Sequence, residues 1–164
     1  LVSVNAGKIV LNQRVLNDKK IFIKPHLSKI GFIFQDYPLF PHLNILDNLK
    51  INLDSKYIRN IPYFIELTGL NKLQERYPQE LSGGEQQRVA IARALISETN
   101  IILADEPTGN LDYKTSKEIF SLFLKLKKLK KTIIFATHNR ELANRADYKL
   151  FISQGNIKRV NAQN

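Results

Sequence analysis

Two adjacent carboxylates, Asp105 and Glu106, follow the unbroken apolar run Ile101–Ala104. Such a run is typical of a parallel strand covered on both faces, and open α/β sheets place their ligand sites at the carboxyl ends of these strands. Adjacent carboxylates repel each other unless a cation lies between them and a substrate. The pattern favours Asp105 as a Mg²⁺ ligand, directly or through water, and Glu106 as a general base; the competing interpretation is a solvated acidic turn.

A glycine turn within Leu81–Arg88 begins a second element with ligand-binding chemistry. Ser82 followed three residues later by Glu85 is a capping box, which satisfies free backbone N–H groups at a helix start. Gly83 and Gly84 permit a close approach that a Cβ would prevent. Because a helix N-terminus attracts anions, the segment predicts a phosphate-binding site, although an ordinary capped helix would carry the same Ser-x-x-Glu pattern.

Five motifs in this chain resemble those of the ABC-type ATPase family and follow that family's order, from about Gly7 to Lys158. The resemblance implies an α/β fold, a P-loop NTPase-like parallel sheet flanked by helices with an inserted α-helical subdomain. The matching segments are Leu81–Arg88 (signature motif), Ile101–Glu106 (Walker B motif), Asn110–Asp112 (D-loop), Ala136–His138 (switch histidine) and Gln35 after a strand at 30–34 (Q-loop).

The resemblance also implies a role for each matching residue, with ATP and Mg²⁺ as ligands. Asp105 would serve magnesium and Glu106 would be the catalytic base. His138 would hold the γ-phosphate and the attacking water, and Gln35 would reach both the metal and the water. The residues expected to act across the interface of a homodimer, on ATP bound to the other subunit, are Ser82, Gly83, Gly84, Glu85 and Asp112.

One motif of the family does not occur in the sequence. The phosphate-binding pattern Gly-x4-Gly-Lys-Ser/Thr is absent, and the nearest candidate, Gly7-Lys8, has Val2 in place of the first glycine and Ile9 in place of the hydroxyl. In the family the P-loop lies upstream of a segment like 6–11. We therefore expect an N-terminally truncated domain without its first strands, its P-loop and its adenine-stacking aromatic, so that hydrolysis is expected of the intact protein rather than of these 164 residues.

Composition agrees with a globular domain and excludes several classes of protein. The length of 164 residues is sufficient for one core, no stretch approaches the ~18 apolar residues of a membrane span, and the absence of cysteine excludes disulfides. The net charge of +10 could favour nucleic acid or an anionic membrane surface. The densest basic run, 125–131, ends a helix with an apolar stripe that includes Leu126 and Leu129, so we expect its lysines on a solvated face and expect no nucleic acid partner.

Hydrophobic patterning predicts the order of helices and strands. We expect a β-hairpin within 7–16, a polar helical region at 44–80 that its prolines interrupt, and a buried helix at 83–97. Residues 100–152 alternate strand and helix in the manner of a parallel sheet, and 154–156 form a turn between the last two strands.

These elements form a single partial nucleotide-binding domain over 1–164. The Q-loop, the helical subdomain and the signature helix occupy about 36–97, and the α/β core comprises 1–35 and 98–164.

The partner is expected to be a membrane permease. In the family the surface after Gln35, here Asp36–His42, receives a coupling helix from a membrane subunit, and exposed Tyr and Phe beside prolines suit such an anchor, although they could also be core. Segments 106–112 and 137–143 look most like the lipoprotein-releasing ATPase of Gram-negative bacteria, whereas 39–42 looks more like amino-acid importers. The implied location is peripheral, on the cytoplasmic face of the bacterial inner membrane.

Several alternatives stay open at this point. The system served could be macrolide export, cell division or amino-acid import, or the chain could be a non-catalytic fragment. A DNA-associated ATPase of the same superfamily would suit the positive charge, but such proteins carry long coiled coils and usually lack a switch histidine, whereas this chain has His138 and no heptad array.

Overall fold

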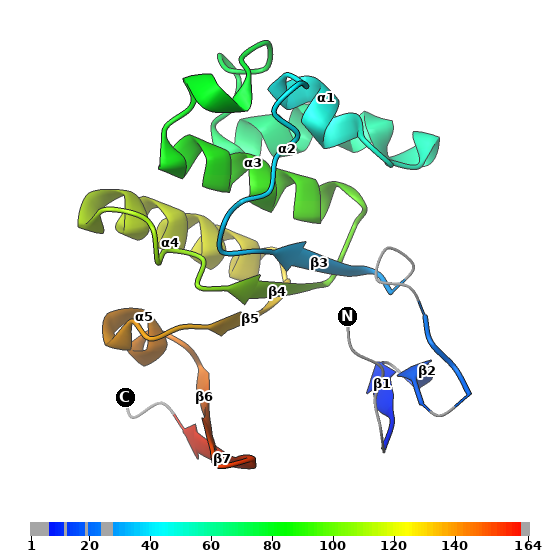
Figure 1. The fold of residues 1–164 in the computed structure, drawn as a ribbon, viewed down its shortest axis with the longest axis vertical. Helices are drawn as coiled ribbons and strands as arrows, with labels where there is room; N and C mark the ends of the chain where they lie inside the picture. Colours follow the sequence, from blue (N-terminus) through cyan, green and yellow to red (C-terminus); the bar gives the residue numbers. More distant parts are fainter. Residues whose placement is uncertain (1–6, 12, 19, 24–27, 162–164) are drawn as a thin grey trace.

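A three-stranded parallel sheet forms the centre of the fold (Figure 1). The computed structural model describes residues 7–11, 13–18, 20–23 and 28–161. Strands β3 (Ile30–Ile33), β4 (Ile101–Asp105) and β5 (Thr132–Ala136) lie side by side in that order, with Ile30 opposite Ile101 and Ile101 opposite Thr132. All three carboxyl ends therefore meet at one edge, which confirms the expected α/β class.

The signature helix, α3 (Gly83–Ile96), covers one face of this sheet. Most of its residues are buried, Ile91 and Leu95 completely, as its nearly continuous apolar sequence predicts. Gly31 of β3 permits the close packing, because a Cβ there would lie 2.6 Å from the carbonyl oxygen of Ala94. The helix that carries the glycine turn is thus fixed directly on the strand that leads to Gln35.

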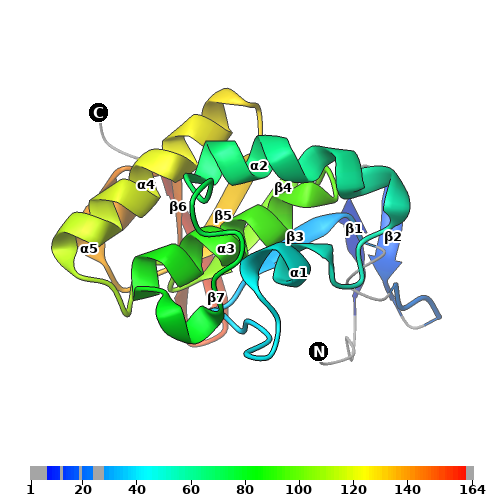
Figure 2. The same cartoon turned by 90° about the horizontal axis from the view of Figure 1, so that it is seen from above.

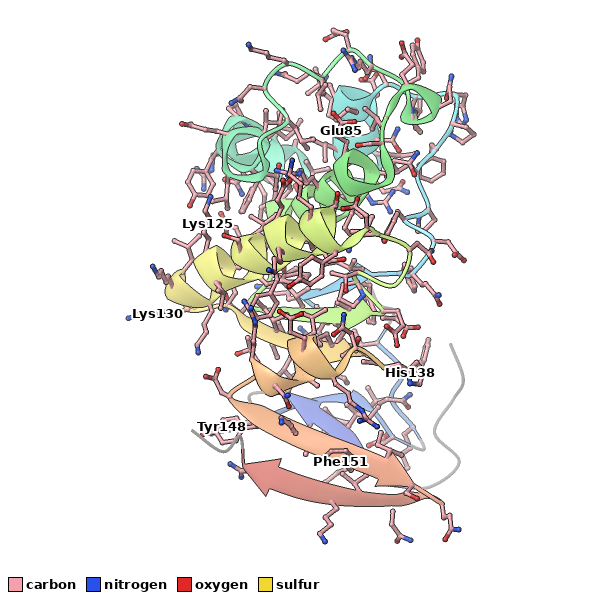
Figure 3. The ribbon with its side chains drawn as sticks, turned by 90° about the vertical axis from the view of Figure 1, so that its left-hand side faces the viewer. Glu85, Lys125, Lys130, His138, Tyr148 and Phe151 are labelled. Carbon is pink, nitrogen blue, oxygen red and sulfur yellow. The ribbon has the colours of Figure 1, made fainter. Side chains whose placement is uncertain are left out.

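Helix α4 (Tyr113–Lys128) is amphipathic and packs beside α3. Ile119, Phe123 and Leu126 are buried, whereas the lysines from 125 to 130 are exposed (Figure 3), which confirms the solvated face for this part of the basic run. Lys131 is half-buried and donates to the carbonyl of Thr99. Leu129, expected in the apolar stripe, is instead the C-cap residue and is 45% exposed, because the helix ends before the next turn can bring it back to the core.

The helical region forms a layer over α3 on the side away from the sheet (Figures 1 and 2). The helical region is interrupted at both prolines, as expected, and each proline lies at the start of a new helix, because a missing N–H costs nothing in a first turn. Pro62 lies in the first turn of α2, and Pro78 opens the short 3-10 helix η3. The elements are α1 (Ile45–Lys50), the 3-10 helix η2 (Ser55–Asn60), α2 (Ile61–Thr68) and η3 (Pro78–Glu80).

Two antiparallel hairpins lie beyond the parallel sheet. The first, β1 (Ile9–Leu11) with β2 (Arg14–Asn17), confirms the hairpin expected within 7–16. The second pairs β6 (Tyr148–Ser153) with β7 (Asn156–Asn161).

The expectation that the strand ending near residue 152 belongs to the parallel sheet was wrong. Gln154 and Gly155 both have positive φ, 48° and 76°, as in a type I′ turn, and this tight turn pairs β6 with β7 rather than with β5 in the part of the chain that the structure describes. The short helix α5 (Arg140–Asn144) joins β5 to β6. Within the described ranges, none of the helices is long and apolar enough to span a bilayer.

Candidate functional site

The chain turns sharply at Glu106, directly after β4. Glu106 has φ 41°, a left-handed conformation that is unusual for a residue with a side chain. Its N–H donates to the carbonyl of Ala136 at 3.0 Å, and its own carbonyl accepts from the N–H of Gly109 at 2.9 Å. Such strain concentrates at functional sites, where the surrounding structure holds it in place.

The Glu106 carboxylate is held by the residues that follow β5. Oε1 accepts from the backbone N–H of His138 at 2.7 Å, and Oε2 accepts from the Thr137 hydroxyl at 3.1 Å. The side chain is 18% exposed, and the His138 ring beside it is fully exposed, with Nε2 3.7 Å from Oε1. A carboxylate can accept about four hydrogen bonds, so Glu106 can still accept one from a water.

An open cleft of about 540 Å³ lies at this edge of the sheet and brings three of the expected catalytic residues together, Gln35, Glu106 and His138. Gln35 follows β3, and its carbonyl accepts a weak hydrogen bond from the Asn110 amide at 3.4 Å. Figure 3 shows His138 at this edge. The other residues that line the cleft are Thr108, Gly109, Leu111, Tyr113, Ser116 and Asn139.

Asp105 is exposed at the end of β4, next to Glu106. No group of three His, Cys, Asp or Glu residues that could hold a metal occurs in the described part of the chain. Mg²⁺ does not need one, since it usually keeps several waters and takes one or two carboxylates together with substrate phosphates. Asp105 does not line the cleft that contains Gln35, so the expected role of these two residues as magnesium ligands stays a prediction.

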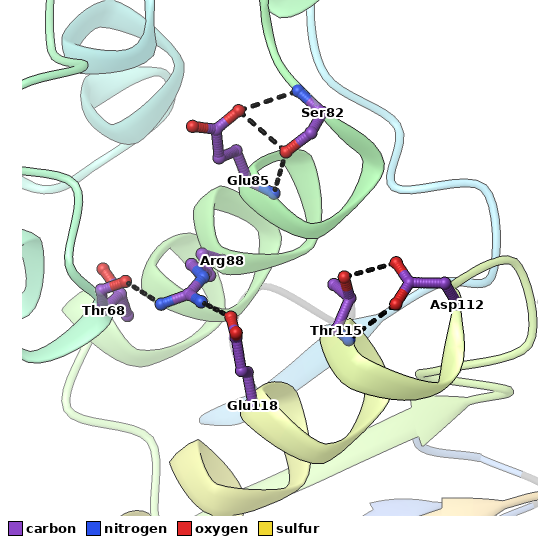
Figure 4. Close-up of polar contacts among 7 residues, drawn as sticks. All are labelled: Thr68, Ser82, Glu85, Arg88, Asp112, Thr115 and Glu118. Carbon is purple, nitrogen blue, oxygen red and sulfur yellow. Dashed lines mark hydrogen bonds and ion pairs between the residues drawn. The ribbon is translucent and has the colours of Figure 1, made fainter.

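The start of α3 forms the capping box that the sequence predicts (Figure 4). The Ser82 hydroxyl accepts from the N–H of Glu85 at 3.3 Å, and Glu85 Oε2 accepts from the N–H and the hydroxyl of Ser82, both at 2.8 Å. These two hydrogen bonds from Ser82 lower the pKa of the Glu85 carboxyl. Glu85 therefore has a structural task here, and its expected contact with ATP stays a prediction.

The glycine turn lies beside the D-loop rather than in the cleft. A Cβ on Gly84 would overlap Cγ2 of Thr115, so only glycine allows this approach of α3 to α4. Asp112 caps α4, accepting from the N–H of Thr115 at 3.0 Å and from its hydroxyl (Figure 4), and these bonds lower the Asp112 pKa. The residues expected to act on the other subunit's ATP thus lie together, apart from Glu106 and His138, although their roles stay predictions.

Arg88 joins the helical region to the core one turn further along α3 (Figure 4). Its guanidinium donates to Glu118 of α4 at 2.6 Å and more weakly to the Thr68 carbonyl at the end of α2 at 3.4 Å. This contact fixes the α3 start between two neighbouring helices.

The sequence interpretation assigned no role to several residues of the site. Thr137 holds Glu106, and its hydroxyl also accepts from the N–H of Asn139 at 3.0 Å. Asn139, Tyr113 and Thr108 line the cleft. Polar Thr137 and Asn139 come soon after an apolar strand, the same signal that identified Asp105, whereas no such signal points to Tyr113.

The expected docking segment after Gln35 needs one correction. Tyr37 is only 6% exposed, so it belongs to the core and cannot be a surface anchor; burial also raises its pKa. The carbonyl of Pro38 accepts from Arg93 at 2.8 Å, which fastens the segment to α3. Phe40 is 38% exposed and His42 is exposed, so these two remain available to a partner.

Comparison with known proteins decides the family. The sequence profile described as "ABC transporter" matches residues 1–109, about two thirds of the chain. The chain belongs to the ABC transporter family. It is 46% identical over 146 residues to the lipoprotein-releasing system ATP-binding protein LolD of Rickettsia typhi, covering 83% of this chain and 66% of that protein. It is 36% identical over 162 residues to the molybdenum import ATP-binding protein ModC of Pectobacterium atrosepticum, covering 96% and 46%.

A solved structure agrees with the architecture of this ABC transporter family member. The dimeric, post-hydrolysis ATP-binding cassette MJ0796 bound to ADP and Pi superposes with a TM-score of 0.79 at 29% identity, covering 99% of this chain and 76% of that one. The chain spans 46% of the length of that ModC protein and 66% of the length of that LolD protein.

Proposed function

We propose that this chain forms the catalytic edge of an ATP-hydrolysing subunit of an ABC transporter. The observation that carries the proposal is the position of Glu106, held in a left-handed turn with its carboxylate fixed by the His138 N–H and the Thr137 hydroxyl at the mouth of a cleft. A carboxylate fixed in this way, with lone pairs still free, suits a general base.

In this proposal Glu106 accepts a proton from the attacking water, and the exposed His138 ring and Gln35 orient that water and the γ-phosphate from two sides of the cleft. Asp105, with Gln35, is the metal-binding side of the site. Bound Mg²⁺-ATP supplies the phosphoryl group and the cation that neutralises the charge developing on it. Because the sequence contains no Gly-x4-Gly-Lys-Ser/Thr loop, hydrolysis is proposed for a protein in which these residues are combined with such a loop.

A homodimer accounts for the residues that lie outside the cleft. Gly84 lies against Thr115, which Asp112 caps, so the Ser82–Gly84 turn and Asp112 lie at the neighbouring starts of α3 and α4. None of them lines the cleft, although Leu111 and Tyr113, on either side of Asp112, do. We infer that this surface contacts nucleotide held by a second subunit, and the dimeric arrangement of the structural neighbour supports the inference.

Lipoprotein release is the transport process that we propose, with a permease docking near Gln35–His42 at the cytoplasmic face of an inner membrane. The 46% identity to LolD supports it, and exposed Phe40 and His42 supply a contact surface. Molybdenum import is the competing system, since ModC matches over more of the chain at lower identity. Depletion of the protein in its source cells should leave lipoproteins in the inner membrane; normal lipoprotein sorting with lost molybdate uptake would reverse the choice.

The substitution Glu106→Gln tests the catalytic assignment. It keeps the shape and the acceptor for the His138 N–H but removes the base, so phosphate release from Mg²⁺-ATP should fall roughly 10²- to 10⁴-fold, with an ATP-bound dimer accumulating on size-exclusion chromatography. Glu75→Gln, at an exposed site in the helical region, is the charge-matched control. Unchanged turnover in the Glu106 variant would reject the assignment.

A further inference from the structure

A buried glutamine connects the start of α3 to the turn that carries Glu106. Gln87 has no exposed surface, and its Nε2 donates to the carbonyl of Pro107 at 2.7 Å. Pro107 directly follows Glu106 and is itself buried. The contact spans 20 residues of sequence and joins the helix that begins at Ser82 to the candidate base.

We propose that Gln87 is a positioning residue for Glu106, holding its turn in the orientation that presents the carboxylate to the cleft. The proposal rests on the proposed function only in taking Glu106 as the base. Gln87 itself does not line the cleft, so it acts through Pro107 and not on a substrate.

The Gln87 bond is one of several contacts that hold the turn, beside those that Glu106 makes with Ala136, Gly109, Thr137 and His138. Glu106 pays for its left-handed conformation with strain of order 1–3 kcal/mol, which persists only where neighbouring groups over-determine it. Pro107 has no N–H, so its carbonyl is the sole backbone hydrogen-bonding group at that position. Gln87 satisfies this carbonyl, and the Gly109 N–H satisfies that of Glu106.

The chemistry of Gln87 also argues against a role as simple core filling. Its Oε1 is buried and finds no hydrogen-bond donor among the residues that the structure describes. A buried polar atom without a partner costs about 1–3 kcal/mol, a cost that Met or Leu at this position would avoid. The hydrogen bond to the Pro107 carbonyl is therefore the contact that explains a buried amide at this position.

The neighbouring Gln86 supplies a matched control. Its Nε2 also donates to a proline carbonyl, that of Pro78 at 2.9 Å, but this contact leads to the helical region and not to Glu106. Gln86 lies in the signature segment but is not among the residues expected to contact ATP. Gln87→Met and Gln86→Met remove the same type of bond from adjacent positions of one helix.

The first measurement is hydrogen–deuterium exchange without nucleotide, on protein expressed from its complete gene. Gln87→Met should raise exchange at the amides of 106 and 108–110, where the Gly109 N–H reports the turn directly, and Gln86→Met should raise it only near 79–82. Equal effects of both variants at 106–110, or none from Gln87→Met, would overturn the proposal.

The second measurement separates kcat from KM with Mg²⁺-ATP. A displaced base should lower kcat by about 10- to 100-fold in Gln87→Met with KM nearly unchanged, and Gln86→Met should lower kcat far less. A fall in kcat of equal size in both variants would assign the effect to general stability and overturn the proposal.

Gln87→Glu is the second variant, in case Gln87→Met folds poorly. Only a protonated carboxyl can donate to the Pro107 carbonyl, so the kcat of Gln87→Glu relative to wild type should rise as pH falls, and a flat ratio counts against positioning. Should Glu106→Gln leave turnover unchanged while Gln87→Met still loosens 106–110, the proposed function fails and the positional link stands.

Discussion

The carboxylates of two glutamates, Glu85 and Glu106, each accept hydrogen bonds from one backbone N–H and one hydroxyl. Glu85 takes both from Ser82, three residues away, whereas Glu106 takes them from His138 and Thr137, 32 and 31 residues away. Glu85 lies in an unstrained helix and Glu106 in a left-handed turn. The start of α3 is therefore shaped by its own sequence, and the Glu106 turn is shaped by a neighbouring strand.

This difference has energetic consequences that can be tested separately. A local cap should survive changes in the packing around it, because donor and acceptor are fixed by the same helical turn. A side chain held from another strand should respond to any change in that strand, since its orientation is a product of tertiary contacts.

The largest effect should come from Gly84→Ala, which strains the packing of α3 on α4 without touching the cap. The new Cβ would overlap Cγ2 of Thr115, a stiff β-branched side chain, so we expect a loss of about 1–3 kcal/mol in the free energy of unfolding despite the better helix propensity of alanine. Denaturant unfolding measures it.

Two variants serve as controls for Gly84→Ala. Thr115→Ser removes the obstructing methyl and should restore much of the loss in the double variant. Gly83→Ala meets only the flexible end of Leu111 at 3.3 Å and should cost far less. Equal losses at the two glycines would show that the close approach of α3 to α4 is not what requires Gly84.

Thr137→Val should weaken the hold on Glu106, whose donors come from a distant part of the sequence. The change keeps the shape of the side chain but removes the hydroxyl that donates to Glu106 and accepts from Asn139, so stability should fall by about 1 kcal/mol. Phosphate release should fall about tenfold, because the carboxylate loses one of its two anchors.

Thr132→Val, at the exposed first residue of β5, the strand that precedes Thr137, is the control for β-branched exchange. If Thr137→Val lowers stability but leaves turnover equal to that of Thr132→Val, the hydroxyl supports the fold and does not orient the base.

The comparison also explains how far sequence reasoning reached. The capping box, the buried helix and the strand ending at Asp105 could be predicted, since each depends on residues that are close together in the sequence. The rule that ligand sites lie at the carboxyl ends of strands also placed Glu106 and His138 at one edge.

Contacts between distant segments could not be predicted. The donors to Glu106, the burial of Tyr37 and the bond from Gln87 to Pro107 depend on how strands and helices pack. The pairing of β6 depends on a local signal instead. The tight turn at Gln154-Gly155 predicts that β6 pairs with β7, and this pairing takes the place of the expected pairing with the parallel sheet.

Ser82→Ala tests the local cap at the start of α3 and should lower the free energy of unfolding by about 1 kcal/mol. It removes the hydroxyl that caps the Glu85 N–H and donates to its carboxylate, and such caps contribute about 0.5–2 kcal/mol. Thermal unfolding measures the loss. Ser82→Gly should cost less, since glycine at an N-cap is only a few tenths worse; a larger loss with glycine than with alanine would contradict the assignment of Ser82 as the cap.

The smallest effect should appear in the pH dependence of stability at Glu85. Hydrogen bonds from Ser82 lower its pKa in the folded state, so the unfolded chain binds more protons over the acidic range and stability rises with pH there. The contribution is complete above the unfolded value of about 4.3 and is lost as pH falls through the folded pKa. Because the group is partly exposed, we expect less than about 1 kcal/mol. Glu85→Gln should flatten this part of the curve, and by a smaller amount in a Ser82→Ala background, where one donor is already gone. A pH dependence that survives Glu85→Gln unchanged would mean that another group, and not Glu85, titrates over this range.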